Sequence, residues 1–317
     1  MILSNLSFKV KKVFMSRFLI QRAFGLGIVS LFALALGACS SVSGAGGAAS
    51  GGGVQILVKK DVDSWAMPSN AYYPPKLSLE DYAVDLKAEP CLEEAGISFR
   101  MARFDPNGAR PETKNAAGDR IFNQKIAAEY GYHEQLDPRI NWEDRKRNHS
   151  DTELSDEQVW KQWHACEEQA MRELGGDPEM IGYSYRFPID SVDRDPAVLE
   201  AEARWRDCMA PLGIPDLGPD AAPLRTPVPT SSQRQKWGWP DDIAPWDIPP
   251  ASADEIEAAI FDAKCRDSSG WSQARYDAEW DAEVAYLTKH YKELEAKRVK
   301  YEAITEAYLN EIREHGE

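Results

Sequence analysis

Four cysteines spread along the chain constrain its fold more than any other sequence feature. They are Cys91, Cys166, Cys208 and Cys265. A fifth cysteine, Cys39, lies upstream at the end of an apolar leader. An even number of cysteines favours two disulfides if the chain is exported, and four cysteines allow three connectivities. A zinc site is the alternative, but there is no C-x-x-C pair, and His164 lies too close to Cys166 for the usual zinc spacings. We therefore expect a disulfide-bonded fold without a metal or other cofactor.

The first part of the chain has the pattern of an export signal. A basic leader precedes an apolar run over residues 23–38, which ends in small residues before Cys39. A membrane-spanning helix needs about 20 apolar residues to cross about 30 Å of hydrocarbon, and this run is too short. The sequence predicts a signal peptide over residues 1–38. Met15 is an alternative start, since basic residues still follow it.

The end of the apolar run resembles the lipobox of bacterial lipoproteins, with the residues Leu36, Gly37, Ala38 and Cys39. The resemblance implies cleavage before Cys39, acylation of its sulfur by fatty chains such as palmitate, and a place on the extracytoplasmic face of the cell membrane. Durable anchoring takes two or more acyl chains, which a diacylglyceryl group supplies. Residues 39–53 are rich in Gly, Ala and Ser and predict a flexible tether with a reach of about 20 Å. Such a tether would not fix the orientation of the body.

The charge of the chain argues against nucleic acid as a partner. There are 37 Lys and Arg against 52 Asp and Glu, a formal net charge of −15. Loss of a leader that contains basic but no acidic residues makes the remainder more negative still. Such a body repels phosphate backbones and anionic lipid heads. An envelope protein is the partner class that we expect instead, besides the membrane that holds the lipid anchor.

Apolar residues recur at helical spacing through most of the remaining chain, which predicts an all-α fold. The expected helices start at Ser78 with a kink or break at Pro90, at Asp119, at a Ser155–Gln158 capping box, at the Asp195-Pro196 cap, at Ser252 and at Trp271. The expected non-helical parts are an edge strand over 54–57, irregular surface chain over 64–76 and an exposed loop over 141–151. We expect one helical domain in two parts, residues 54–210 and 252–317.

The last helix is the longest that the sequence predicts. A helix from Trp271 to Glu314 would extend about 65 Å. Apolar residues recur in it every seven positions, at Leu287, Leu294, Tyr301 and Tyr308. This seam favours a helix folded back on its own domain, and a coiled coil with a partner chain is the alternative.

Residues 211–251 are named here the Pro/Trp segment. It contains ten of the 20 prolines of the chain, together with three tryptophans, Trp237, Trp239 and Trp246. So many prolines exclude a helix or a central strand. A pure linker does not need three tryptophans, so we expect an extended belt packed over the helices, with these tryptophans as the candidate contact surface. A proline-rich arm that binds another protein is the alternative.

Two sequence similarities bear on the cysteines. Cys91 and Cys208 each precede a helix-ending glycine by five residues, and this internal echo favours the pairs Cys91–Cys166 and Cys208–Cys265. In addition, the stretch 195–213, with its Trp-x-x-Cys-Met-x-x-x-Gly helix, resembles a family of uncharacterised secreted proteins and lipoproteins of actinobacteria. That resemblance implies an all-α, disulfide-bonded, exported fold and no catalytic role.

We find no motif that predicts a particular reaction. The chain lacks a Gly-x-Ser-x-Gly elbow, a His-Glu-x-x-His pair, a phosphate-binding loop and a calcium-binding loop. A divalent ion could be held by Asp190, Asp193, Asp195 and Glu200, but Asp195 is better explained as a helix cap. The sequence favours a non-enzymatic binding or scaffold protein of the cell envelope. The alternative is an envelope hydrolase that acts on cell-wall glycan or peptide.

Overall fold

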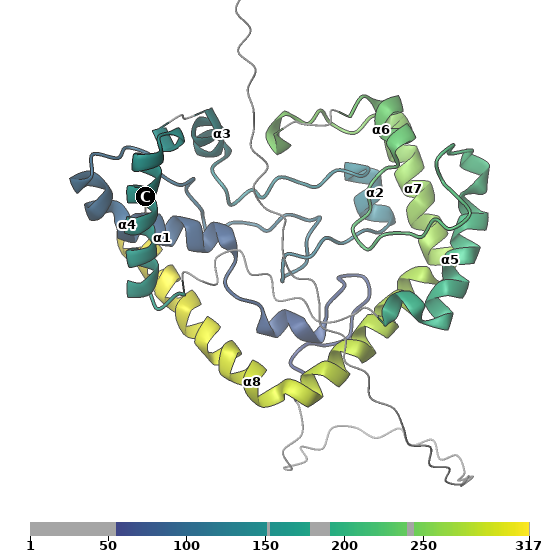
Figure 1. Cartoon of the computed structure of the whole chain (residues 1–317). Helices are drawn as coiled ribbons and strands as arrows, with labels where there is room; N and C mark the ends of the chain where they lie inside the picture. The colour runs from purple at the N-terminus through teal and green to yellow at the C-terminus, as the bar shows by residue number, and fades with distance from the viewer. Residues whose placement is uncertain (1–54, 151–152, 178–190, 240–243, 317) are drawn as a thin grey trace, which may run out of the picture. The chain divides into compact units, whose positions relative to one another are not determined.

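The computed structural model describes residues 55–150, 153–177, 191–239 and 244–316. The predicted signal peptide and tether therefore lie outside the described residues. The described part contains eight α-helices and no strand, which confirms the all-α fold class (Figure 1). The helices are α1 (Leu77–Glu94), α2 (Gln124–Tyr130), α3 (Trp142–Ser150), α4 (Glu157–Glu173), α5 (Pro196–Met209), α6 (Ser231–Trp237), α7 (Ala253–Ser268) and α8 (Trp271–His315).

Helix α8 packs against other parts of the chain along its whole length. Near its start, Trp271 and Tyr276 pack with residues of α5, and near its end Tyr308 packs in a core shared with α1 and α4. In its middle, Leu287 and Leu294 are buried against Tyr72 of the short 3₁₀ helix η1 (Pro68–Tyr72). The seven-residue seam thus faces the chain's own core, as predicted for a helix that folds back on its domain.

Two disulfides join helices in pairs. Cys91 of α1 bonds Cys166 of α4, and Cys208 of α5 bonds Cys265 of α7, with Cα–Cα distances of 5.7 and 5.6 Å. Both predicted pairs are confirmed. Cys166 and Cys265 are buried, because each lies on the apolar face of an amphipathic helix that packs on its bonded neighbour.

The predictions for α1 were wrong in two details. The helix begins at Leu77 with Lys76 as its cap residue, and no side chain caps it, so Ser78 is not the cap. Pro74 and Pro75 precede this cap, and a proline disfavours the helical conformation of the residue before it, so Tyr73 is extended. The helix also runs through Pro90 without a break. Pro90 has no N–H to donate, so this turn lacks one backbone hydrogen bond. The disulfide from the next residue, Cys91, to α4 holds the turn in place.

Two other helix boundaries differ from the prediction. Helix α2 begins at Gln124 rather than at Asp119, because the Asn123 side chain caps it by accepting from the Ile126 amide at 3.0 Å. Helix α4 is capped by Asp156, one residue after Ser155, through the amides of Gln158 and Val159.

Four segments expected to be non-helical differ from the prediction. Residues 142–150 form α3, because Asn141 accepts from the first amides and the buried Asp144 binds Arg103 at 2.7 Å. Residues 68–72 form η1 and are largely buried against α8. Residues 55–57 form no strand. The Pro/Trp segment, expected to be extended, contains α6, and Thr230 and Gln233 form a capping box at the N-terminus of this helix.

We predict that each disulfide contributes to stability independently. Replacement of Cys91 and Cys166 together by alanine should lower the free energy of unfolding by about 3–4 kcal/mol, since the bond closes a loop of 75 residues. The matching double variant at Cys208 and Cys265, with 57 residues, should lose nearly as much. Urea unfolding at equilibrium measures both, and a loss below about 1 kcal/mol for either pair would contradict the prediction.

Candidate functional site

The three tryptophans of the Pro/Trp segment lie in two separate places. Trp237 ends α6 and Trp239 follows it, and both pack against α7. Trp246 lies instead against Trp142 and His149, with ring centroids 5.9 and 5.3 Å apart. The expectation that the segment packs over the helices is therefore met in its described part. The candidate contact surface divides, and only Trp237 and Trp239 share a site.

A buried carboxylate of α7 organises the chain around Trp239. Glu255 is 1% exposed and accepts the Tyr132 amide at 3.0 Å with one oxygen. Its second oxygen lies 3.1 Å from His133 Nε2 and accepts the Trp239 indole N–H at 3.0 Å. Burial acts to raise the pKa of Glu255, but hydrogen bonds from His133, Trp239 and the Tyr132 amide keep it below its ordinary value. The group is therefore a charged anchor that joins two other chain segments, residues 132–133 and Trp239, to α7.

Two turns further along α7, a buried ion pair continues this network. Asp262 and Arg266 form two hydrogen bonds of 2.9 and 3.1 Å, and both residues are buried. Asp262 also accepts from the Trp205 indole at 2.8 Å and from the Tyr132 hydroxyl at 3.3 Å. Burial, followed by the negative Asp262, raises the pKa of Tyr132. Arg266 donates to the Leu224 carbonyl at 2.8 Å and so ties the Pro/Trp segment to α7.

A groove of about 560 Å³ opens between the Pro/Trp segment and α7. Its apolar lining comes from both sides, with Leu212, Ile214, Pro215, Trp237, Ala258 and Phe261. At its edge Asp254 accepts the Trp237 indole N–H at 3.1 Å and pairs with Lys236 at 2.6 Å. Glu257 also lines the groove, is exposed, and has no ion-pair partner among the described residues. The groove combines an aromatic wall with carboxylates at its rim.

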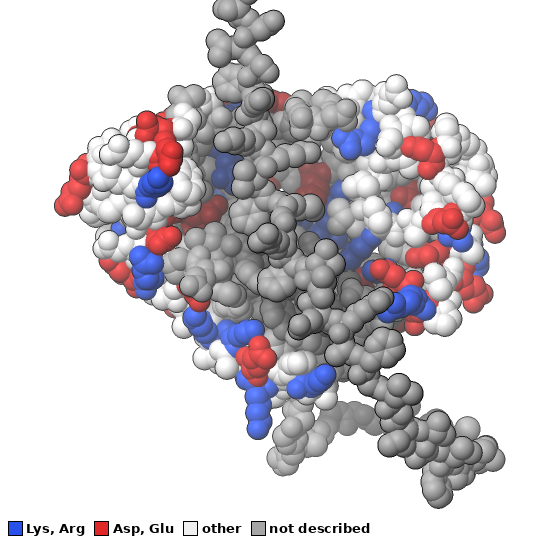
Figure 2. Space-filling view, viewed as in Figure 1, with Lys and Arg blue, Asp and Glu red and all other residues white. Residues whose placement is uncertain are grey.

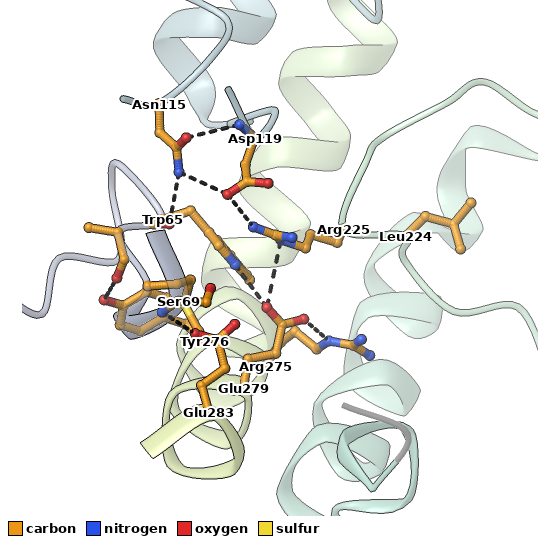
Figure 3. A network of polar contacts seen from close by, with 12 residues as sticks. Trp65, Ser69, Asn115, Asp119, Leu224, Arg225, Arg275, Tyr276, Glu279 and Glu283 are labelled. Atoms are coloured by element: carbon orange, nitrogen blue, oxygen red, sulfur yellow. Dashed lines mark hydrogen bonds and ion pairs between the residues drawn. The ribbon is translucent and has the colours of Figure 1, made fainter. Parts of the chain in front are cut away.

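A further polar network ties the start of the described chain to α8 (Figure 3). Glu279 is 1% exposed, and accepts from the Trp65 indole at 2.9 Å and from Arg275 at 2.7 Å. Arg225 of the Pro/Trp segment lies 3.6 Å from Glu279 and 3.3 Å from Asp119. Arg225 and Arg275 thus lie beside Glu279, and these opposite charges hold the segments together. Glu283, drawn in the same view, accepts the Ser69 amide at 2.9 Å, and burial raises the pKa of Glu283 to about 7.

Acids with raised pKa values lie between α1 and α4. Burial, followed by the charges of Asp85 and Asp81, raises the pKa of Glu167 to about 8. Burial also raises the pKa of Asp85 to about 7, against the opposing charge of Arg100. One oxygen of Asp85 and one of Glu167 have no hydrogen-bond partner within the described structure. These groups lie beside the Cys91–Cys166 bond, and their direct effect is on stability.

We predict that stability falls as the pH rises, because of these acids. A carboxyl group with a raised pKa in the folded state stabilises the fold fully below its ordinary pKa and loses this contribution as the pH rises through the raised value. The free energy of unfolding should therefore fall between about pH 5 and pH 8. Glu167→Gln should reduce this fall by about 2–3 kcal/mol in urea unfolding series at several pH values. Glu168→Gln, an exposed neighbour, is the control and should leave the profile unchanged.

Two of the aspartates that the sequence suggested as ion ligands have other partners in the described part of the chain. Asp195 caps α5 through the amides of Ala197 and Val198, as expected. Asp193 pairs with Arg275 at 2.5 Å, and Asp190 lies outside the described residues. No group of three His, Cys, Asp or Glu in the described residues could hold a metal ion.

Sequence reasoning missed Glu255 and the groove beside it. One signal was present, because Glu255 lies one helical turn before Ala259 and two before Ala263, and so on the buried stripe of α7. An acid on a buried stripe indicates a polar partner from elsewhere in the chain. No spacing rule identified Tyr132, His133 or the Pro/Trp segment as that partner.

We predict that Glu255 is required for packing of the Pro/Trp segment. Glu255→Ala removes a buried charge and leaves three donors unpaired, so the free energy of unfolding should drop by about 3–5 kcal/mol. Glu257→Ala, exposed on the same helix, should change it by less than about 0.5 kcal/mol. Equilibrium unfolding followed by tryptophan fluorescence checks both, and equal effects would contradict the role given to Glu255.

Comparison with known proteins adds no relative, since no protein family, curated protein or solved structure matches this chain. The similarity to the actinobacterial family thus stays a prediction. Among the described residues, no helix combines the length and the apolar character needed to cross a membrane, and even α8 is rich in charged side chains.

Proposed function

We propose that this chain is a lipid-anchored extracytoplasmic protein that binds a partner of the cell envelope without catalysing a reaction. Its support comes from two disulfides between helix pairs, because such bonds persist in oxidising compartments. The leader that ends in Ala38-Cys39 supplies a route out of the cytoplasm and an attachment to the membrane. The disulfides in the helical body and the leader at the start of the chain thus support export independently.

The groove between the Pro/Trp segment and α7 is the binding site that we propose. It offers an apolar lining that includes Trp237 and Phe261, and aromatic side chains contribute much of the binding energy at protein interfaces. Asp254 at its rim is already paired with Lys236, so the exposed carboxylate of Glu257 is the group that favours a partner segment with positive charge next to apolar side chains. An envelope protein with an exposed segment of that kind is the partner class.

The lipid anchor is tested by removing the sulfur of Cys39, to which the acyl chains would be attached. Cys39→Ser should abolish incorporation of labelled palmitate and shift the protein from the membrane fraction to the soluble one. The thiol count of the purified body is the companion measurement, since four bonded cysteines leave no free thiol. The proposal would be contradicted if Cys39→Ser stayed in the membrane fraction as the wild type does and the wild type took up no labelled palmitate.

The groove is tested by filling it. Ala258→Tyr places a bulky side chain in the groove, whereas Ala203→Tyr places the same side chain on the exposed surface of α5. Cross-linking and pull-down from detergent-solubilised membranes should lose the partner with the first variant and keep it with the second. A partner retained equally by both variants, and by a variant without residues 211–250, would remove this groove from the proposal.

One observation favours the alternative of an envelope hydrolase. Glu80, Asp177 and Tyr308 line a cavity of about 210 Å³, and burial with the nearby Asp81 raises the pKa of Glu80 to about 7. A protonated carboxyl group beside a second carboxylate is the arrangement of glycoside hydrolysis. Release of soluble fragments from purified cell wall, abolished by Glu80→Gln, would establish this alternative in place of a binding function.

A further inference from the structure

The middle of α8 has a charge opposite to that of the chain as a whole. Residues 289–300 contain five basic side chains and two acidic ones, whereas the net charge of the chain is −15. In Figure 2 blue side chains gather over this part of α8. Their concentration in one stretch of one helix makes a local positive surface on an acidic protein.

Three of these lysines share the outward face of the helix. At 3.6 residues per turn, Lys289, Lys292 and Lys300 fall within about 80° of the helix circumference, opposite the buried Leu287 and Leu294. All three lysines are exposed, and none has an ion-pair partner within the described structure. This set is named here the lysine face. Lys289 and Lys292 point away from the core, and Lys300, at the end of the face, also lines the cavity beside Glu80.

The first described residues lie on the same part of α8. Ile56 packs against Leu287, Leu294 and Tyr72, and the next residue, Leu57, is 45% exposed. The predicted tether is joined to the body at this point, only a few residues before Ile56. Ile56 lies on the side of α8 opposite the lysines but at the same level along the helix axis. A tether with a reach of about 20 Å can pass around a helix about 10 Å wide, so an anchor at Cys39 keeps the lysine face within reach of the membrane.

We propose that the lysine face is a docking surface for the anionic surface of a lipid bilayer, and that it fixes the orientation of the tethered body. This inference rests on the lipid anchor of the proposed function. It replaces the sequence-based expectation of a tether that leaves the orientation free. The groove beside α7 lies on other elements of the fold and contains no residue of α8.

The acidity of the rest of the chain does not prevent this docking. Charges further than a Debye length, about 8 Å at physiological ionic strength, are largely screened. Only the side chains that face the bilayer contribute strongly, and there the positive ones dominate. The acidic remainder is repelled from the same surface, so that one orientation is favoured over the others.

A fluorophore on the lysine face tests the orientation. Ala296 is exposed in the same stretch, and Ala203 on α5 is the matched control position. Because the body cysteines are bonded and Cys39 is acylated, a cysteine introduced at either position is the only free thiol of the lipidated full chain. The chain is reconstituted into vesicles of 30% phosphatidylglycerol and 70% phosphatidylcholine, and quenching by nitroxide-labelled lipids is measured.

The label at position 296 should be quenched severalfold more than the label at 203, and 0.5 M salt should abolish the difference. Each lysine near an anionic surface accounts for about a fivefold change in affinity, so a charge reversal at all three should remove the contact. The test variant is Lys289→Glu/Lys292→Glu/Lys300→Glu. The control variant, with the same change in net charge, is Lys125→Glu/Lys161→Glu/Lys264→Glu, and it should keep the contact.

The outcomes separate this inference from the proposed function. Equal quenching at both label positions, or an equal response to both triple variants, would overturn the docking face while palmitate labelling of Cys39 leaves the anchor intact. An unlabelled Cys39 would overturn the anchor and the docking face with it. If soluble polyglutamate changes the fluorescence of the label but anionic vesicles do not, the face recognises an acidic polypeptide, and the membrane proposal is wrong.

Discussion

The fold depends on the burial of one face of α8 along its entire length. A helix of 45 residues with so many charges is not held by its own hydrophobic content. It is held because Trp271, Leu287 and Tyr308 each pack against a different part of the chain. The disulfide-bonded pairs α1–α4 and α5–α7 both contact this helix. The bonds restrict the unfolded chain within each pair, and α8 connects the pairs.

Buried charges attach the segments that have little regular structure. The described part of the Pro/Trp segment contains one short α-helix, yet Arg225 reaches Glu279, and Trp239 reaches Glu255. Each contact joins it to a carboxylate on a long helix. Such pairs cost desolvation and are weak sources of net stability, but an unpaired partner would cost more. They therefore specify where an irregular segment lies, which apolar contacts alone leave open.

The proposed roles lie on different parts of the chain. The groove that we propose for a partner is formed by α6, α7 and the chain before α6, whereas the membrane-facing lysines belong to the middle of α8. A lipid anchor with a charged face beside it would hold the body in a defined orientation, and a binding groove gains from this because its partner then meets it at a fixed height and angle.

The sequence by itself determined the helical class, the cap at Asp195 and the long last helix, because each depends on local spacing. Its internal echo favoured both disulfide pairs, but the choice among three connectivities was made by the tertiary structure. It did not determine that residues 142–150 are helical, that α1 continues through Pro90, or that Glu255 is buried. Contacts with distant residues decide these features. They are the ion pair of Arg103 with Asp144, the disulfide at Cys91, and the hydrogen bonds from Tyr132 and Trp239 to Glu255. Such partners come from distant positions in the chain, and only the tertiary structure brings them together.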